Sequence, residues 1–300
     1  MTESDGYGRI KTDESLRETV HHGSEEYPFQ YYLEDIWLFD FHCIDWHWHW
    51  HPEVEFVLIE KGTADFLIGS ERYVLSAGTG IFINSQVIHR FEAAESTIIP
   101  NVVFSPLLLA GEESLIYRKF IRPVLDSPSE CLIFSPDDPG QRDTLDVLAS
   151  VFALQKSDEV CEIETVELLL KLWRMMYRNM EPVEEASGLR SSARTRAQLQ
   201  IMLQYIHKNF RQPITLEDIA DTVMLSKSSV LNLFRENIHT PPIDYLINYR
   251  LKNAARLLVT TENSVSSVAR DTGFENIGYF CRKFKEVFHL TPGEYRSKGN

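Results

Sequence analysis

The spacing of apolar residues changes twice along the chain, and these changes divide it into segments. Residues 1–30 are polar with little periodicity, and we predict an arm there. Short runs rich in β-branched and aromatic residues, punctuated by glycine, then follow at 54–59, 63–68, 72–75, 80–83, 88–91 and 97–104. Regular short strands of this kind predict a small barrel or double-sheet jelly roll over residues 31–104.

From residue 105 the apolar positions recur every three to four residues, which indicates helices. Candidate helices cover 115–125, 143–155 and 160–180, and the last has a continuous apolar stripe. Residues 105–180 are therefore predicted to be helical. Residues 181–196 combine Pro, Gly, Ser and charged side chains, and we interpret them as an interdomain linker.

A predicted helix at 196–208 opens the segment of residues 197–300, which then contains a repeated pattern. Residues 215–220 align with 264–269, and residues 234–245 align with 284–295. A repeat of roughly 50 residues is typical of a duplicated supersecondary unit. The slip of one residue between the two alignments falls where a turn would tolerate an insertion.

Each copy is predicted to contain two short helices around a tight turn. Thr215 and Ser226 are candidate N-caps in the first copy, and Ser264 and Asn276 are their counterparts in the second. Two helices with this spacing are typical of the DNA-binding helix-turn-helix. A connecting helix from Pro242 onward would span roughly 25 Å, which suits two helices that enter successive major grooves about 34 Å apart.

Several short motifs stand in register with this repeat: Arg250-Leu251, Gly273-Phe274, Tyr279-Phe280, Arg282, Phe284-Lys285 and the run from Thr291 to Arg296. On these residues the region resembles the AraC/XylS family of bacterial transcription regulators. The family usually has glycine where this chain has Met224, His239 and His289. The resemblance implies a DNA-binding domain at 197–300 with two helix-turn-helix modules, and a dimerisation segment at 105–180.

The charge of the chain is unevenly distributed. The formal net charge is −14, but residues 197–300 carry 13 Lys+Arg against 10 Asp+Glu, a net of +3, which leaves −17 for residues 1–196. The basic groups thus belong to the part that would meet phosphates. The four cysteines are far apart and are expected to be reduced thiols, and no leader or membrane span is expected. We expect a soluble cytoplasmic protein without a membrane partner.

An alternating run from Asp45 to Glu55 contains the most unusual local sequence, with His47, His49 and His51 on one face. Its spacing resembles that of the cupin family, in whose metal-binding members His49, His51, Glu55 and the later His89 would be ligands. The Pro, Gly and Asn of the second cupin motif are replaced by Asn84, Gln86 and Ala93. The resemblance implies a cupin-like effector-binding barrel at 31–104, and it is stronger for the barrel than for the metal.

Two interpretations of this cluster remain open. His49, His51, Glu55 and His89 suit a divalent Zn²⁺, Mn²⁺ or Fe²⁺ ion, although the sequence requires no cofactor. Alternatively, these residues and His47 hydrogen-bond an organic effector such as a sugar or related metabolite, and this is the outcome that we expect. A metal-dependent cupin enzyme, a metal-sensing regulator and a ligand-free DNA-binding scaffold are the competing classes. No second catalytic constellation accompanies the histidines, so we expect no enzyme and no catalytic residue.

The exposed faces of the two predicted recognition helices supply the candidate DNA contacts. We expect Asn232 and Arg282 to contact base edges and Lys227, Arg235 and Lys285 to contact phosphates. The complete candidate set is Lys227, Ser228, Leu231, Asn232, Arg235, Ile277, Gly278, Arg282, Lys283 and Lys285. The expected partners are double-stranded promoter or operator DNA, a small-molecule effector, a second copy of the chain in a homodimer, and RNA polymerase.

Overall fold

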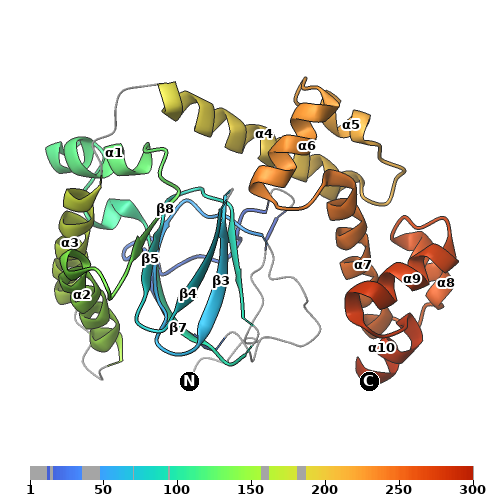
Figure 1. Cartoon of the computed structure of the whole chain (residues 1–300), viewed down its shortest axis with the longest axis horizontal. Coiled ribbons are helices and arrows are strands. Elements are labelled where there is room, and N and C mark those ends of the chain that lie inside the picture. The colour runs from blue at the N-terminus through green and yellow to red at the C-terminus, as the bar shows by residue number, and fades with distance from the viewer. Residues whose placement is uncertain are drawn as a thin grey trace. The chain divides into compact units, whose positions relative to one another are not determined.

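A computed structural model describes residues 12–13, 16–35, 48–69, 71–93, 95–156, 162–180 and 187–299. The chain forms two compact units (Figure 1). One unit is rich in β-strands and includes residues 48–180, and the other is helical and includes residues 195–299. None of the helices in the described ranges combines the length and apolarity that a membrane span requires.

Two antiparallel sheets form the β-rich unit. The five-stranded sheet has the order β1 (Phe29–Asp35), β7 (Ile98–Phe104), β2 (Val54–Leu58), β5 (Gly80–Ile83) and β8 (Cys131–Phe134). The three-stranded sheet has the order β4 (Glu71–Ser76), β3 (Thr63–Ile68) and β6 (His89–Glu92). Strands β2 to β7 thus lie within two residues of their predicted positions.

The sheets do not close into the predicted barrel. In the described residues, an isolated bridge joins His49 to His89 at the end of β6, and another joins Lys61 to Ile98. Pro52 follows the first bridge and lacks the N–H group that a continuing ladder needs. The predicted continuous strand from His49 to Glu55 is therefore interrupted, and β2 begins only at Val54.

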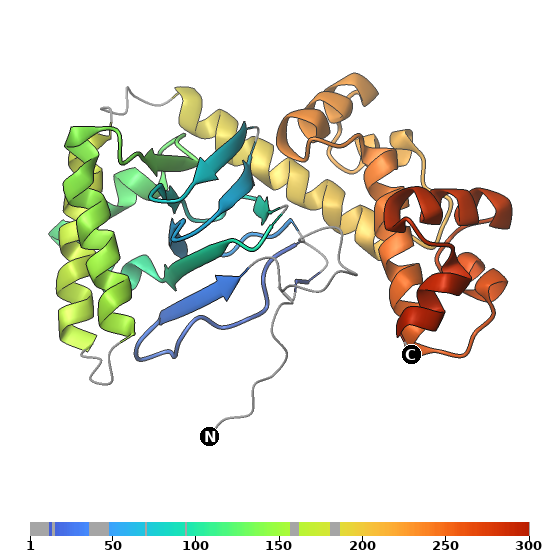
Figure 2. The ribbon, with the colours of Figure 1, turned by 60° about the horizontal axis from the view of Figure 1, so that its bottom comes forward.

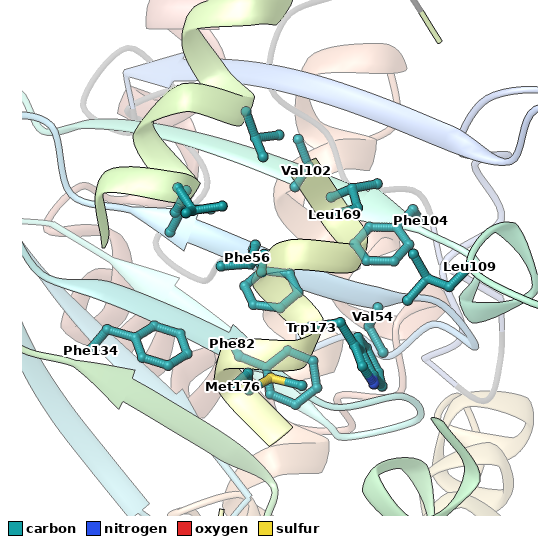
Figure 3. Close-up of a cluster of buried hydrophobic side chains, with 14 of the residues drawn as sticks. Val54, Phe56, Phe82, Val102, Phe104, Leu109, Phe134, Leu169, Trp173 and Met176 are labelled. Carbon is teal, nitrogen blue, oxygen red and sulfur yellow. The ribbon is translucent and has the colours of Figure 1, made fainter. Parts of the chain in front are cut away.

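The main core of this unit lies between the five-stranded sheet and helices α2 (Pro139–Gln155) and α3 (Glu162–Asn179), which lie side by side in Figures 1 and 2. Figure 3 shows Phe56, Phe82 and Phe104 of the sheet packed with Trp173 of α3. The indole Nε1 of Trp173 donates to the carbonyl oxygen of Phe120 at 3.0 Å. Because strand residues alternate in direction, Phe56 faces these helices and Glu55 faces the opposite side.

Four elements of this unit differ from the sequence prediction. Strand β1 begins at Phe29, inside the predicted arm, and β8 lies within the segment predicted to be helical. A short 3-10 helix, η1 (Pro106–Leu108), precedes the predicted helix 115–125. In place of the predicted helix 115–125, the chain forms a π-helical turn, η2 (Tyr117–Ile121), followed by α1 (Arg122–Leu125). Pro123 in α1 lacks the N–H that a regular α-helix would use.

The helical unit begins within α4 (Ser187–Asn209). This helix starts before residue 196, so part of the predicted linker is helical. After α4, the helical unit contains α5 (Leu216–Asp221), α6 (Lys227–Asn237), α7 (Pro242–Thr260), α8 (Val265–Asp271), α9 (Ile277–Phe288) and α10 (Pro292–Gly299). The predicted N-caps Thr215, Ser226, Ser264 and Asn276 all accept a hydrogen bond from a backbone N–H of the following turn.

Candidate functional site

Three buried histidines meet in the β-rich unit. The metal-ligating nitrogens of His49, His51 and His89 all lie within 4.8 Å of one another. Backbone hydrogen bonds of 3.1 and 2.9 Å join His49 to His89, and they bring the two ends of the motif together. The predicted sharing of one face by His49 and His51 is consistent with this arrangement.

Glu55 reaches the same cluster from β2, despite the interruption at Pro52. Its Oε2 atom lies 3.3 Å from Nε2 of His89 and 3.6 Å from Nε2 of His51. Burial raises the pKa of the Glu55 carboxyl, but its contacts with His51 and His89 outweigh burial and hold that pKa below its usual range. The site therefore contains a carboxylate among imidazoles, away from water.

Backbone carbonyl groups fix the orientation of two of the rings. The Nδ1 atom of His89 lies 2.9 Å from the carbonyl oxygen of Val87, and Nδ1 of His51 lies 3.2 Å from that of Glu53. A carbonyl oxygen only accepts a hydrogen bond, so Nδ1 is the donor in both rings. The other nitrogen of each ring, Nε2, faces Glu55.

The turn between β5 and β6 holds His51 and His89 in place. The backbone N–H of Gln86 donates to the carbonyl oxygen of His51 at 2.8 Å. Gln86 has a φ of 60°, so the left-handed conformation that a glycine would adopt is retained here by a glutamine. Asn84 donates from Nδ2 to the carbonyl oxygen of Val124 at 2.8 Å, and this ties the turn to α1.

His22 is a buried neighbour of the cluster that the sequence analysis missed. Its ring centroid lies 5.4 Å from that of His51, and its Nδ1 lies 2.9 Å from the hydroxyl of Tyr32. Burial lowers the pKa of His22, but the carboxylate of Glu18, 3.4 Å away, outweighs burial and raises it overall. His22 lies far from the cupin motifs in the sequence, so no spacing could have revealed it.

The other predicted member of the pocket, His47, lies outside the described residues. Of the nearby tryptophans, Trp48 is buried, with the guanidinium of Arg90 5.3 Å from its ring centroid. Trp50 is half-buried, and Arg17 lies 5.9 Å from its ring. These two indoles therefore pack against arginines of the protein.

In the helical unit, α6 and α9 have matching surfaces. The pattern of buried, half-buried and exposed residues is the same, position by position, in residues 231–240 and 281–290. Phe234 and Phe284 are fully buried at equivalent positions. The sequence repeat is therefore also a repeat of burial, and each helix has one inward and one outward face.

Most candidate DNA contacts lie on the outward faces. Lys227, Ser228, Asn232, Arg235, Ile277, Gly278, Arg282 and Lys285 are exposed, whereas Leu231 and Lys283 are half-buried. Ion pairs of 2.7 Å join Lys227 to Glu217 and Lys283 to Glu286. The guanidinium of Arg282 lies 5.4 Å from the centroid of the Tyr279 ring.

The turns around these helices need left-handed residues at the predicted positions. Gly273, between α8 and α9, has a φ of 86°, and Met224, between α5 and α6, has a φ of 52°. His239 and His289, which follow α6 and α9, both have a φ of 55°. The non-glycine residues therefore adopt the conformation for which glycine is better suited.

Known families match both units. The family model of the AraC-like ligand binding domain matches residues 39–113, and that of a helix-turn-helix domain matches residues 219–298. An uncharacterized HTH-type transcriptional regulator, YdeC of Bacillus subtilis (strain 168), is 30% identical over 293 residues, which cover 95% of this chain and 97% of that protein. The chain belongs to the AraC family of transcriptional regulators. It has an AraC-type helix-turn-helix domain and an N-terminal ligand-binding domain.

Other AraC-family proteins are similar over different lengths. The HTH-type transcriptional activator RhaS of Enterobacter sp. (strain 638) is 24% identical over 245 residues, 81% of this chain and 84% of that protein. The crystal structure of an AraC-type DNA-binding transcriptional regulator from Chromobacterium violaceum is 27% identical and covers 36% of this chain and 96% of its own, with a TM-score of 0.34. The regulators among these relatives point to a role other than catalysis.

Proposed function

We propose that this AraC-family regulator reads DNA with two helix-turn-helix modules, formed by α5–α6 and α8–α9. The matching burial of residues 231–240 and 281–290 is the observation that carries the proposal. Both second helices begin at a side-chain N-cap, Ser226 or Asn276, and present a polar outward face. A repeated outward face is expected where two helices perform the same task in two grooves.

Helix α7 is the spacer between the modules. Its 19 residues correspond to a length of about 28 Å at 1.5 Å per residue. This length suits two helices that enter successive major grooves on one side of the duplex, about 34 Å apart. Each chain then recognises two DNA segments about one turn apart.

The outward residues have two expected roles. Asn232 and Arg282 are assigned to base edges, because Asn pairs with adenine and Arg with guanine in the major groove. Lys227, Arg235 and Lys285 are assigned to phosphates. Ser228, Leu231, Ile277, Gly278 and Lys283 make up the rest of the proposed DNA surface. The net charge of +3 over residues 197–300, from 13 basic and 10 acidic residues, supports the assignment.

The regulatory signal is proposed to bind at residues 31–104, in the site formed by His49, His51, Glu55 and His89, with His47 of the same motif as a further member. These polar side chains are buried and contact one another, and a bound ligand would replace some of these contacts or add to them. These imidazole and carboxylate groups suit either a small polar metabolite, such as a sugar, or a divalent metal ion. Binding of the ligand there would change the affinity of the protein for promoter DNA. The regulator is proposed to act in the cytoplasm, with RNA polymerase as a further partner.

A second copy of the chain is proposed to bind at the helical segment 105–180. Ile163 and Leu170 of α3 have exposed fractions of 76% and 39%, although α3 also supplies the inner core residues Leu169 and Trp173. An apolar outer stripe on such a helix suits a homodimer. Residues 197–300 would then reach two operator halves in one complex.

Selection of random DNA by the purified full-length protein tests the proposed DNA reading. We expect recovery of a sequence with two conserved segments about 10 base pairs apart for each chain. Recovery of no preferred sequence under any ligand condition, from folded protein at low salt, would contradict the proposal.

A further inference from the structure

We propose that Ile277, at the start of α9, recognises a thymine through the C5-methyl group that this base presents in the major groove. This inference rests on the proposed DNA reading by α8–α9, and it names the base for one residue of that surface. Thymine is the only one of the four DNA bases with a methyl group on its major-groove edge. An apolar side chain that reaches this edge therefore favours thymine over the other bases.

Ile277 is the first helical residue of α9. Asn276 precedes it as the N-cap, and the Oδ1 atom of Asn276 accepts a hydrogen bond from the backbone N–H of Tyr279 at 2.8 Å. In a helix-turn-helix, the N-terminal residues of the second helix are the ones that contact base edges. The side chain of Ile277 thus belongs to the turn of α9 that lies nearest the bases in this mode of binding.

The side chain of Ile277 lies outside the buried face of its helix. The inward face of α9 consists of the buried rings of Phe280, Phe284 and Phe288, whereas Ile277 is 38% exposed. Apolar surface in water is unfavourable, and contact with another apolar group removes that surface from water. Among the outward residues of α9, such as Arg282, Ile277 supplies the apolar group that a thymine methyl would contact.

The equivalent position of the first module has a charged residue instead. Lys227 follows the N-cap Ser226 and forms an ion pair of 2.7 Å with Glu217 of α5. In the sequence repeat, Glu217 corresponds to Ser266 of α8, so the second module has neither charge at these two positions. The two modules therefore differ where their second helices begin. This difference predicts a phosphate contact at Lys227 and an apolar contact at Ile277.

Gly278, the next residue of α9, has no side chain to keep the helix away from DNA. It is exposed, and its φ lies outside the left-handed region that would require glycine. A β-carbon on Gly278 would lie 3.3 Å from Oδ1 of Asn276, but Ser228 occupies the corresponding place beside the N-cap of α6. Glycine is less favourable than alanine inside a helix, and it suits a place where the backbone approaches another molecule closely.

Arg282 indicates where the thymine should lie. It follows Ile277 by five residues, which corresponds to about 7.5 Å along the helix axis at 1.5 Å per residue. This distance is roughly the rise of two base pairs. Because Arg282 is assigned to a guanine, we expect the thymine within about three base pairs of that guanine.

Replacement of thymine by uracil tests this inference. Each thymine of the DNA selected by the full-length protein is replaced in turn by uracil, which lacks only the methyl group, and binding is measured by fluorescence anisotropy. We expect one thymine, in the segment where Arg282→Ala relaxes base preference, whose replacement weakens wild-type binding about three- to five-fold. Ile277→Ala should bind the thymine and uracil DNAs equally. Ile277→Val should keep a smaller preference, because part of the apolar side chain remains.

Ile201→Ala is the matched control, because Ile201 is 45% exposed on α4 and lies outside the recognition helices. It should keep the wild-type preference for thymine, and circular dichroism checks that every variant is folded. If uracil weakens no complex, or weakens that of Ile277→Ala as much as that of the wild type, Ile277 does not recognise a methyl group. The selected DNA would then still support the proposed DNA reading. If folded wild-type protein selects no DNA, that reading and this inference fail together.

Discussion

The guanidinium of Arg250 in α7 donates from Nε to the carbonyl oxygen of Phe210 at 2.6 Å, just beyond the end of α4. A second nitrogen of the same group donates to the carbonyl oxygen of Gln212 at 2.6 Å. Arg296 of α10 contacts Leu258 and Asn263 in a similar way at the end of α7. In both places the planar guanidinium group donates hydrogen bonds to two backbone carbonyl groups near the C-terminal end of a helix, where carbonyl groups lack partners within the helix.

Arg250→Lys should therefore destabilise the helical unit by about 1–3 kcal/mol, because a lysine cannot reproduce both hydrogen bonds. Urea unfolding measures the effect. Arg256→Lys is the control, since Arg256 is exposed on the same helix. Equal stability of the two variants would show that the Arg250 contacts contribute little.

Met224→Gly should stabilise the protein by about 0.5–1 kcal/mol, because the left-handed backbone at this position strains any side chain. Met224 has a φ of 52° and is 93% exposed, so its removal sacrifices little packing. Met224→Ala separates the two effects, because alanine removes the side chain but keeps the strain. A melting temperature that rises equally in both variants would contradict the strain argument.

Phe234→Ala and Phe284→Ala should each cost roughly 3–5 kcal/mol, because both rings are fully buried in equivalent positions. Thermal melting measures this cost, and Phe284→Leu should lose much less because most of the volume remains. Any loss of DNA binding should then follow unfolding. A Phe284→Ala protein that melts normally but no longer binds DNA would contradict this structural role.

Arg282→Ala should weaken binding to the selected DNA by about 1–3 kcal/mol and relax preference at one base pair. Lys227→Ala should instead weaken binding to all sequences and flatten the salt dependence, as expected for a phosphate contact. Fluorescence anisotropy at several salt concentrations measures both effects. Arg256→Ala removes the same charge as Arg282→Ala from outside the two recognition helices, so it should leave base preference intact.

Local patterns predicted much of the helical unit. Ser226, Ser264 and Asn276 are N-caps as expected, because capping depends on a few neighbouring residues. The need for left-handed residues at His239 and His289 was also predictable from the family resemblance. The extent of α4 was not, because residues 187–196 look like a linker and yet lie in the helix.

The β-rich unit was predicted less completely, because tertiary contacts decide several of its features. His49, His51, Glu55 and His89 lie together as the motif spacing indicated, but Pro52 interrupts the strand that was expected to join them. Strand β8 is only four residues long, and its pairing with β5 cannot be read from so short a run. His22 joins the cluster through the folding of the chain, which no local pattern contains.

We propose that α6 and α9 contact two DNA segments from one chain, and missing-contact footprinting of the selected DNA with full-length protein tests this arrangement. We expect two clusters of essential bases about 10 base pairs apart for each chain, with Arg282→Ala erasing contacts in one cluster and Asn232→Ala in the other. A single cluster per chain, or two clusters that neither substitution changes, would show that the two helices do not bind DNA in this way.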